Sequence, residues 1–538
     1  MSADRRERLL AFAFIAATFM LVLAPERGYV PIWDGRVYAN CAVEAAANGL
    51  SIESLRCAGH PSQGYAFFLA FSQSIRLGDV SLMLLANMLL GLLALACIRV
   101  SLDRVFPSKE HARSLDLVTL VCAVHPVLLS TLVQPNVDFG VYVFFFASLA
   151  ALLSGQLGWA AMAGLFLCFS KETGVLVYGL MIGLEAAFRF GHGGGTPAER
   201  FQRVLPLSVT FAPLVAFASH VVWWDAAHAQ SAVWKHQWQK GTLDGFSFFD
   251  LSDPIFVSYA AGIFVLGFMW VVSAIIAGDL VVAGVRTARR QADRPVPGAD
   301  PRALGYVTVL AAVLTYSLTS FRTWSNLRYF ALLYPLLILL VFAALVRLGV
   351  AARLRTAALV ALAGLFLFAT YRSADPVSRA VYGTFSIGDR EMYRMASITG
   401  EFRGPGRDQL VYNLEFTGYH HVQNALFRAL RPSDSTVFAT SRLTRWNSWS
   451  QLDARRWQRT LARDQVIVPR YYDEVDIAAM PAKPRDVWFL DFSNHADKDD
   501  ALRQLAPFYR EESILRVRAR GHVLKAHHLV RREAEVVP

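Results

Sequence analysis

The chain has 538 residues, of which 54% are hydrophobic and only 18% charged, and its mean hydropathy is +0.35. A soluble protein of this size carries about a quarter charged residues. The composition therefore excludes a soluble globular protein and indicates a polytopic membrane protein. The net charge of +11 is interpreted as cytoplasmic loop anchors, and a nucleic-acid partner is not expected.

The first apolar run, 9–24, follows the basic start MSADRRERLL. No small-residue cleavage site follows Leu23, and Pro25 comes almost at once, so we expect an uncleaved membrane helix and not a signal peptide. Further runs approach the roughly 20 residues of a membrane helix. With the first, they predict about eleven spans, the others at 80–98, 115–133, 139–154, 158–170, 174–188, 204–222, 255–277, 303–319, 329–346 and 356–371.

Basic residues alternate between the loops. They cluster in the segments 5–8, 99–113, 189–203, 286–302 and 347–355, whereas the shorter loops of the other side hold few. Because Lys and Arg near span ends favour the cytoplasm, the N-terminus is expected inside. Residues 1–371 then form a membrane domain, and 372–538 lie outside the membrane.

The segment 372–538 contains no spanning run. Asp486–Phe492 is typical of a strand, Asp499–Tyr509 of a helix and Ser513–Arg518 of another strand. Alternating strands and helices predict a small extracytoplasmic α/β domain.

The first outer loop, 25–79, contains the sequence Pro31-Ile-Trp-Asp34-Gly-Arg36-Val-Tyr38. Asp34 lies just beyond the membrane surface among aromatic and small residues, where a carboxylate is able to take a proton from a hydroxyl. The alternative is a turn residue before Gly35. The same loop holds Cys41 and Cys57, for which a disulfide worth about 3 kcal/mol is plausible in an oxidising compartment. Two unpaired thiols are the alternative.

Two further outer loops carry ionisable residues. In Gln134-Pro-Asn-Val-Asp138, Asp138 is either a helix N-cap or a second carboxylate that binds substrate or a divalent ion. In Ser170-Lys-Glu-Thr173, Lys171 is either half of a surface pair with Glu172 or a phosphate ligand.

The loop before the tenth span adds Arg322, Arg328 and Tyr329. The planar guanidinium of Arg328 suits phosphate oxygens at the level of a lipid head group. Snorkelling toward lipid phosphates in general is the alternative reading of this arginine.

Other candidates are less specific. His60 is either a substrate or metal ligand or a packed histidine. The loop 223–253 contains Trp223, Trp224, Trp234, Trp238, His228 and His236, which indicate an interfacial belt or a sugar-stacking wall without a zinc pattern. The segment Asp408–His421 is expected to form a strand and turn, although its polar and aromatic residues would also suit an acceptor.

Together these motifs resemble the GT-C superfamily of integral membrane glycosyltransferases, which includes aminoarabinose, protein O-mannosyl and arabinofuranosyl transferases. The likeness rests on Trp33–Tyr38, the turn from Pro135 to Asp138, Lys171 and Arg328-Tyr329, and it covers roughly residues 1–370. It implies a polyprenyl-phosphate-sugar donor, with Asp34 as catalytic base and Lys171 and Arg328 on the lipid phosphate. Many members carry two adjacent acidic residues at the first motif.

The expected activity is therefore an inverting transfer of a hexose or pentose to a glycan, lipid or protein acceptor. The expected location is a bacterial inner membrane with a periplasmic C-terminal domain. Substrate contacts are expected from Asp138, Lys171, Arg328, Tyr329, Arg322, His60 and Tyr38. No cofactor is certain, and a divalent cation, if bound, would use Asp34 and Asp138; Gly35 argues against it.

Two other functions fit a polytopic protein. A transporter or lipid flippase would show internal repeats and mid-membrane charges; the sequence shows no repeat, and its candidates share one face. An O-antigen ligase or polymerase generally has its large outer loop between late spans, whereas the long loop comes first in this chain.

Overall fold

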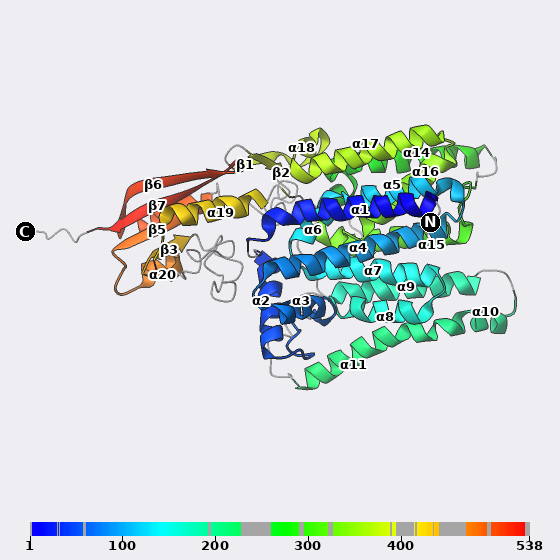
Figure 1. Cartoon of the computed structure of the whole chain (residues 1–538), viewed down its shortest axis with the longest axis horizontal. Coiled ribbons are helices and arrows are strands. Elements are labelled where there is room, and N and C mark those ends of the chain that lie inside the picture. The colour runs from blue at the N-terminus through cyan, green and yellow to red at the C-terminus, as the bar shows by residue number, and fades with distance from the viewer. Residues whose placement is uncertain are drawn as a thin grey trace, which may run out of the picture.

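The computed structural model describes residues 3–29, 31, 33–57, 61–191, 195–227, 260–289, 295–320, 327–387, 390–393, 414, 417–433, 435–440, 470–491 and 496–532. Figure 1 shows a bundle of long, nearly parallel helices with a smaller domain of strands and helices at one end. The predicted class, a helical membrane protein with a C-terminal α/β domain, is confirmed.

The bundle contains α1 (Ala3–Leu23), α4 (Val80–Val105), α5 (Ala112–Ala123), α6 (Pro126–Val133), α7 (Val137–Leu153), α8 (Leu157–Cys168), α9 (Glu172–Gly191), α10 (Pro197–Val204), α11 (Ala212–Ala227), α14 (Met269–Ala288), α15 (Pro301–Thr319), α16 (Leu333–Arg347) and α17 (Ala352–Tyr371). Among the described residues, seven helical segments are long and apolar enough to cross a membrane. An eighth results if α5 and α6, bent by 55°, count as one, and α7, α8 and α16 are shorter apolar helices.

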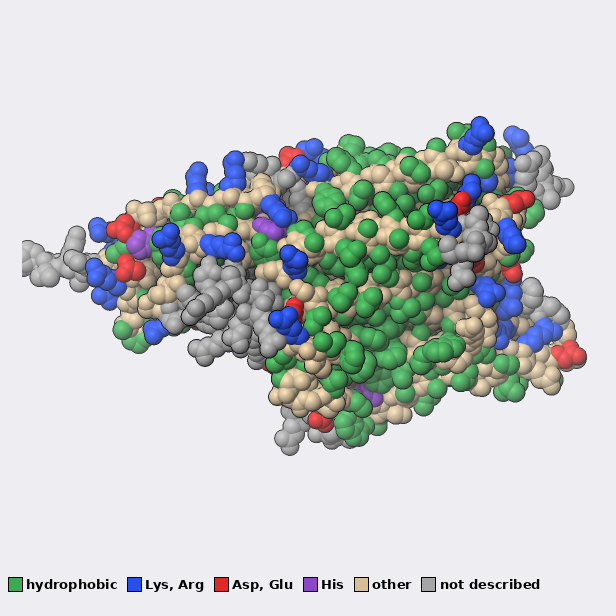
Figure 2. All heavy atoms as spheres, viewed as in Figure 1, with side chains coloured by type: hydrophobic (Ala, Val, Ile, Leu, Met, Phe, Trp, Pro, Cys, Tyr) green, Lys and Arg blue, Asp and Glu red, His purple; other side chains and the backbone are tan. Residues whose placement is uncertain are grey.

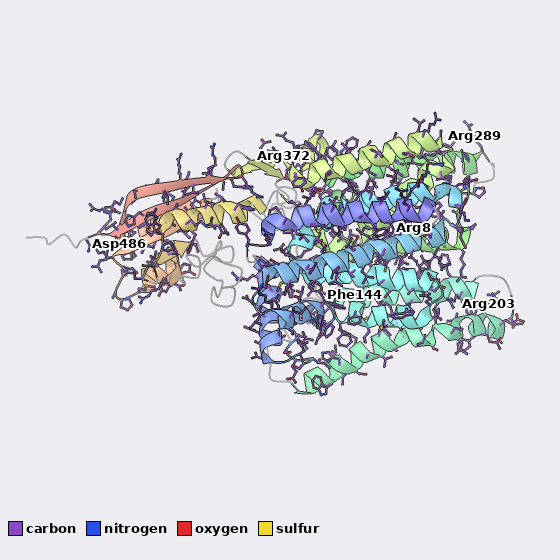
Figure 3. All side chains as sticks on the ribbon, in the orientation of Figure 1. Arg8, Phe144, Arg203, Arg289, Arg372 and Asp486 are labelled. Atoms are coloured by element: carbon purple, nitrogen blue, oxygen red, sulfur yellow. A yellow bond between two sulfur atoms is a disulfide. The ribbon has the colours of Figure 1, made fainter. Side chains whose placement is uncertain are left out.

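The outside of the bundle has the pattern of a membrane protein. Figure 2 shows hydrophobic side chains spread over the length of the bundle. Basic side chains gather at the end of the bundle away from the C-terminal domain and over that domain. Arg8, Arg203 and Arg289 lie toward the end away from that domain, and Arg372 lies at the opposite end (Figure 3). Three of the five basic segments predicted to share one side are thus represented at the same end of the bundle.

Two helices occupy the segment that was expected to be a long loop. These are α2 (Trp33–Asn48) and α3 (Gln63–Ile75), and α2 lies across the end of the bundle that faces the C-terminal domain (Figure 1). The expectation of a loop at Asp34 is therefore wrong, because α2 is rich in alanine, the best helix former. A disulfide between Cys41 and Cys57, with their Cα atoms 5.9 Å apart, joins α2 to the segment before α3.

The C-terminal domain follows α18 (Pro376–Tyr382) and the antiparallel pair β1 (Thr384–Ile387) and β2 (Arg390–Tyr393). Its five-stranded mixed sheet has the order β4-β3-β5-β7-β6. The strands are β3 (Val437–Thr440), β4 (Arg470–Asp473), β5 (Asp486–Asp491), β6 (Tyr509–Ala519) and β7 (His522–Arg531), and the helices are α19 (Thr417–Leu430), α20 (Glu474–Ala479) and α21 (Ala496–Leu505).

The sequence predicted the elements of this domain only in part. β5 and β6 fall where strands were expected, but α21 ends at Leu505, and Tyr509 already belongs to β6. Residues 417–421, expected in a strand and turn, begin α19. Residues 408–413 lie outside the described part of the chain.

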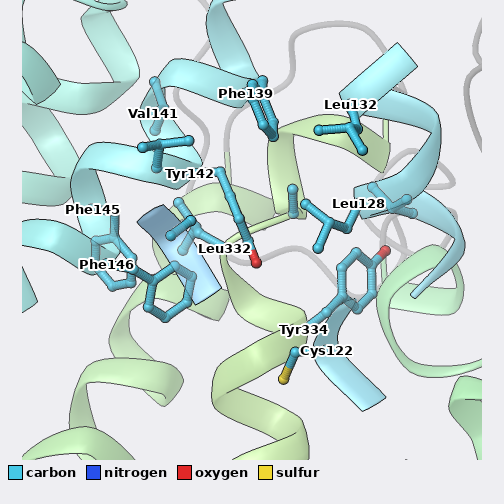
Figure 4. Close-up of a cluster of buried hydrophobic side chains, with 14 of the residues drawn as sticks. Cys122, Leu128, Leu132, Phe139, Val141, Tyr142, Phe145, Phe146, Leu332 and Tyr334 are labelled. Carbon is cyan, nitrogen blue, oxygen red and sulfur yellow. The ribbon is translucent and has the colours of Figure 1, made fainter. Parts of the chain in front are cut away.

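The interior of the bundle is apolar and aromatic. Figure 4 shows Tyr142, Phe145 and Phe146 of α7 in a cluster that also includes Cys122 of α5 and Tyr334 of α16. Asp138 lies one helical turn before Tyr142 on the same helix. The candidate site therefore begins at the edge of this packed core.

Candidate functional site

Three residues that the sequence singled out meet in one buried cluster. Lys171 Nζ donates a hydrogen bond of 2.7 Å to Asp138 Oδ1, and Arg328 Nε donates one of 2.9 Å to Asp138 Oδ2. Asp138 is 4% exposed, Arg328 7% and Lys171 8%. Both oxygens of one carboxylate thus hold two cations that would otherwise repel each other.

Asp138 is held by the turn that begins α7. The Asn136 side chain caps this helix by accepting a 3.0 Å hydrogen bond from the Asp138 N–H. The alternative reading of Asp138 as the N-cap is therefore wrong. Because Asn136 takes the capping role, the Asp138 carboxylate is left to face the two cations.

A buried hydrogen-bond network from α3 and α4 supports this turn. The Tyr65 hydroxyl accepts from the Asn136 N–H at 3.3 Å and donates to Asn87 Oδ1 at 2.7 Å. Asn87 Nδ2 in turn donates to the Leu132 carbonyl at 3.1 Å. Sequence reasoning missed Tyr65 and Asn87, although an amide within the apolar helix α4 is a recognisable sign of a required polar contact.

Lys171 lies between α8 and α9 and reaches the cluster from there. Its Nζ also lies 3.9 Å from the centroid of the Tyr329 ring, a cation–π contact. Burial lowers the pKa of Lys171, but the charge of Asp138, the Tyr329 side chain and the hydrogen bond to Asp138 together raise it more, and the net pKa is raised. Lys171 is therefore protonated at neutral pH. It pairs with Asp138, so the alternative of a surface pair with Glu172 is not supported.

Arg328 lies in the short 3₁₀ helix Leu327–Phe330, immediately before α16. Its Cζ is 5.6 Å from the centroid of the Tyr329 ring, so that ring contacts both cations. Because Arg328 is buried against Asp138, snorkelling into the general lipid surface does not describe it. Arg322, the other basic residue of this loop, lies outside the described residues.

A small pocket adjoins the cluster. Its polar wall includes Asp138, Arg328, Tyr329 and Thr173, and its other walls are Val141, Tyr142, Val177, Leu318 and Leu332. The two cations exceed the one carboxylate by one positive charge, so the cluster as a whole favours a neighbouring anion. Arg328 lines the pocket, whereas Lys171 is not part of its lining, and the pocket has room for about one water molecule.

The backbone of Asp34 lies in the first turn of α2. The next residue, Gly35, contacts the turn Gln134–Asn136, which leads into α7 and Asp138. A Cβ at position 35 would lie 2.6 Å from Gln134 Cγ and 3.2 Å from the Pro135 carbonyl oxygen. Only glycine fits without a shift of α2 or of this turn. The side chain of Asp34 lies outside the described part, so the contact places its backbone only.

Among the remaining predicted residues, the structure describes the side chain of Tyr38. It is buried in the bundle core and does not line the pocket. His60 lies outside the described residues, as do His228, His236, Trp234 and Trp238. The Trp223 side chain, near the end of α11, is half exposed and lies against the ring of His220.

No group of three His, Cys, Asp or Glu side chains arranged for a metal ion occurs among the described residues. Asp138, named from the sequence as one of two metal ligands, has its charge offset by Lys171 and Arg328. A carboxylate already shared by two cations is a poor ligand for a third. The geometry therefore favours an anion at this site.

Comparison with solved structures identifies the fold. The crystal structure of ArnT from Cupriavidus metallidurans bound to undecaprenyl phosphate matches with a TM-score of 0.56 and 14% identity over 98% of each chain. The apo structure of the same protein matches with a TM-score of 0.54 and 13% identity, again over 98% of each chain. The chain has the GT-C fold.

Other comparisons add little to this assignment. The apo oligosaccharyltransferase of Archaeoglobus fulgidus aligns at a TM-score of 0.40 and 12% identity, over 86% of this chain and 64% of its own, too low to support an argument. No protein-family model and no curated protein sequence matches the chain. At such identities the likeness to the GT-C proteins concerns the fold, and the chemistry has to be argued from the site.

Proposed function

We propose that the chain is a membrane glycosyltransferase that moves a sugar from a polyprenyl-phosphate-linked donor to an acceptor outside the cytoplasm. The observation that carries the proposal is the buried cluster of Lys171 and Arg328 on Asp138, with its excess of positive charge and with apolar side chains of the bundle nearby. A lipid phosphate has the matching chemistry, since its head is anionic and its tail is hydrocarbon. The similarly folded ArnT was crystallised with undecaprenyl phosphate.

In the proposed reaction, Asp34 takes the proton of the acceptor hydroxyl as the oxygen attacks the anomeric carbon. The bond from that carbon to the phosphate oxygen breaks, and its electron pair leaves with the polyprenyl phosphate. Lys171 and Arg328 stabilise the negative charge that develops on this leaving group. A single displacement of this kind inverts the anomeric configuration.

The role of Asp138 follows from its two partners. It is a positioning residue that keeps Lys171 and Arg328 close to each other, within reach of one phosphate. Lysine has three N–H donors and arginine five, more than the one hydrogen bond that each gives to Asp138. Asp138 therefore organises the phosphate site without needing to leave it.

The orientation is part of the proposal. The basic end of the bundle, marked by Arg8, Arg203 and Arg289, would lie in the cytoplasm, and Arg372 and the C-terminal domain would lie outside (Figure 3). The cluster on Asp138 and the start of α2 would then lie at the outer end of the bundle. An inner membrane of a bacterium, with the domain 372–538 in the periplasm, fits this arrangement.

Mass spectrometry of envelope glycans and glycolipids from cells with and without the protein tests this function. Loss of one sugar from a glycan, glycolipid or glycoprotein, restored by the wild-type chain and not by Asp34→Asn, is the expected result. An unchanged glycan profile with an altered distribution of lipids would contradict the proposal and favour a flippase.

A further inference from the structure

The C-terminal domain contacts the chain just ahead of Asp34. His421 of α19 places its Nε2 3.4 Å from Oε1 of Glu26, in the 3₁₀ helix Ala24–Glu26 that ends the first membrane helix. The same imidazole packs against the Tyr29 ring, edge to face, with centroids 4.4 Å apart. One side chain of the domain thus contacts two residues of the segment that leads into α2.

This contact is buried and local. Glu26 is 3% exposed, and the side chain of His421 is 11% exposed. The Tyr29 N–H donates a 2.9 Å hydrogen bond to the Glu26 carbonyl, so these two residues belong to one turn. Both contacts of His421 are therefore with this turn. Four residues separate Tyr29 from Asp34. A shift of this turn therefore reaches the first turn of α2 over a short length of chain.

The domain side of the contact is firmly built. A Cβ on Gly418 would lie 2.4 Å from the His522 ring, so α19 is packed closely on β7. Burial and then the Glu26 carboxylate raise the pKa of Tyr29, and the charges of Arg428 and Arg520 oppose this rise only in part. Three residues of the domain, His421, Arg428 and Arg520, therefore interact with Tyr29.

The segment that leads from α17 to the C-terminal domain has its own contacts with the bundle. The Asp375 N–H donates to the Tyr393 hydroxyl at 2.7 Å, and the Asp375 carboxylate accepts from the Phe268 N–H and from Trp270 Nε1, each at 3.0 Å. These contacts lie where the chain leaves α17, before the strands and helices of the domain. The contact of His421 with Glu26 is therefore a separate link from the domain itself to the segment before α2.

We propose that His421 is a positioning residue for the reaction. Through Glu26 and Tyr29 it holds the segment that enters α2, and so it fixes the turn of α2 that carries Asp34. This inference rests on the proposed role of Asp34 as base. It gives the C-terminal domain a function in catalysis, in addition to any contact with the acceptor.

Hydrogen–deuterium exchange of the full-length protein tests the coupling without requiring a substrate. In His421→Ala, amide exchange in peptides covering 24–29 and 33–40 should rise about threefold or more, because a stabilising contact of a local unit is lost. His528→Ala is the matched control. It removes a histidine of the same domain, on β7, that pairs with Glu512 of β6 at 2.8 Å. It should leave both peptides unchanged.

Two further variants keep this test decisive. Glu26→Gln weakens the same contact from the bundle side and should raise exchange in the same two peptides, whereas His421→Gln, which keeps a donor, should restore much of the protection. If His421→Ala also raises amide exchange in β5 and β7, the domain itself has loosened. The coupling is then judged from Glu26→Gln alone. Unchanged exchange at 24–29 and 33–40 in Glu26→Gln, or in a folded His421→Ala, overturns the proposal.

Turnover separates this inference from the proposed function. In cells that accumulate the wild-type product, His421→Ala should lower its rate of formation about tenfold, since small misplacements of a reacting group are costly. Undecaprenyl phosphate should bind the purified variant as it binds the wild type. A wild-type protein that makes no glycan product refutes the function, while normal turnover of His421→Ala refutes only the positioning role.

Discussion

The Nζ of Lys171 lies 2.7 Å from Oδ1 of Asp138, across 33 positions of the chain and between two different helix ends. Arg328 completes this pair from a third region, so that loops far apart in the sequence form one cationic site. Such a buried group is costly unless each charge is paired. Its net positive charge is the reason to expect an anionic ligand at this site.

Removing either cation should weaken binding of a lipid phosphate. Lys171→Ala and Arg328→Ala should each lower the affinity for undecaprenyl phosphate about 10- to 100-fold, the range expected for a charge-assisted hydrogen bond of about 1.5–3 kcal/mol. Titration of the purified protein with this lipid measures the effect. Arg372→Ala removes an exposed arginine at the end of the bundle that faces the C-terminal domain and should bind normally. Equal losses in all three variants would point to general surface charge.

Asp138→Asn should destabilise the protein, because it leaves two buried cations without their carboxylate. The expected cost is about 3–5 kcal/mol, as for breaking a buried ion pair. Undecaprenyl phosphate should raise the Tm of this variant more than that of the wild type, since the phosphate supplies the missing negative charge. A Tm shift by the lipid that is equal in both proteins would argue against a shared anion site.

Gly35→Ala should be harmful although the change adds one methyl group. The new Cβ would lie 2.6 Å from Gln134 Cγ, so either α2 or the turn before Asp138 has to move. We expect a loss of stability of about 1–3 kcal/mol, as for overpacking, together with reduced transfer. Gly28→Ala is the control, because no atom lies within 4 Å of a Cβ built there. Thermal unfolding that is equally affected in both variants would contradict this packing argument.

The disulfide between Cys41 and Cys57 should stabilise the α2–α3 segment. Cys57→Ser is expected to cost about 3 kcal/mol by the loop-closure estimate, measured by thermal unfolding without reductant. Non-reducing peptide mapping should find these two cysteines linked, and Cys97, Cys122 and Cys168 as free thiols. Free thiols at both positions in protein purified without reductant would exclude the bridge.

The sequence predicted the fold well where a single physical rule dominates. Apolar run length indicates membrane helices because it follows from the thickness of the bilayer. Among the described residues, seven helical segments, or eight with the bent pair α5 and α6, are long enough to span, against about eleven predicted. The helix α2 was missed, because in an outer segment its alanine-rich sequence lacks the length of a span and the short polar stretch around Asp34 is equally typical of a turn.

The site was predicted as a set of residues but not as an arrangement. Asp138, Lys171 and Arg328 stand out because each is ionisable beside an apolar run. That Asp138 binds both cations depends on tertiary packing of three loops, which no local pattern encodes. The supporting contacts of Tyr65 with Asn87 and of Gly35 with Gln134 are likewise long-range and have no sequence motif.

One comparison decides whether Asp34 is the base of a lipid-phosphate glycosyltransferase. Wild type and Asp34→Asn are measured side by side for sugar transfer in cells and for binding of undecaprenyl phosphate in purified form. We expect transfer to fall at least about 100-fold in the variant, as for loss of a general base, while lipid binding stays within a few-fold. Near-normal transfer by Asp34→Asn would contradict it.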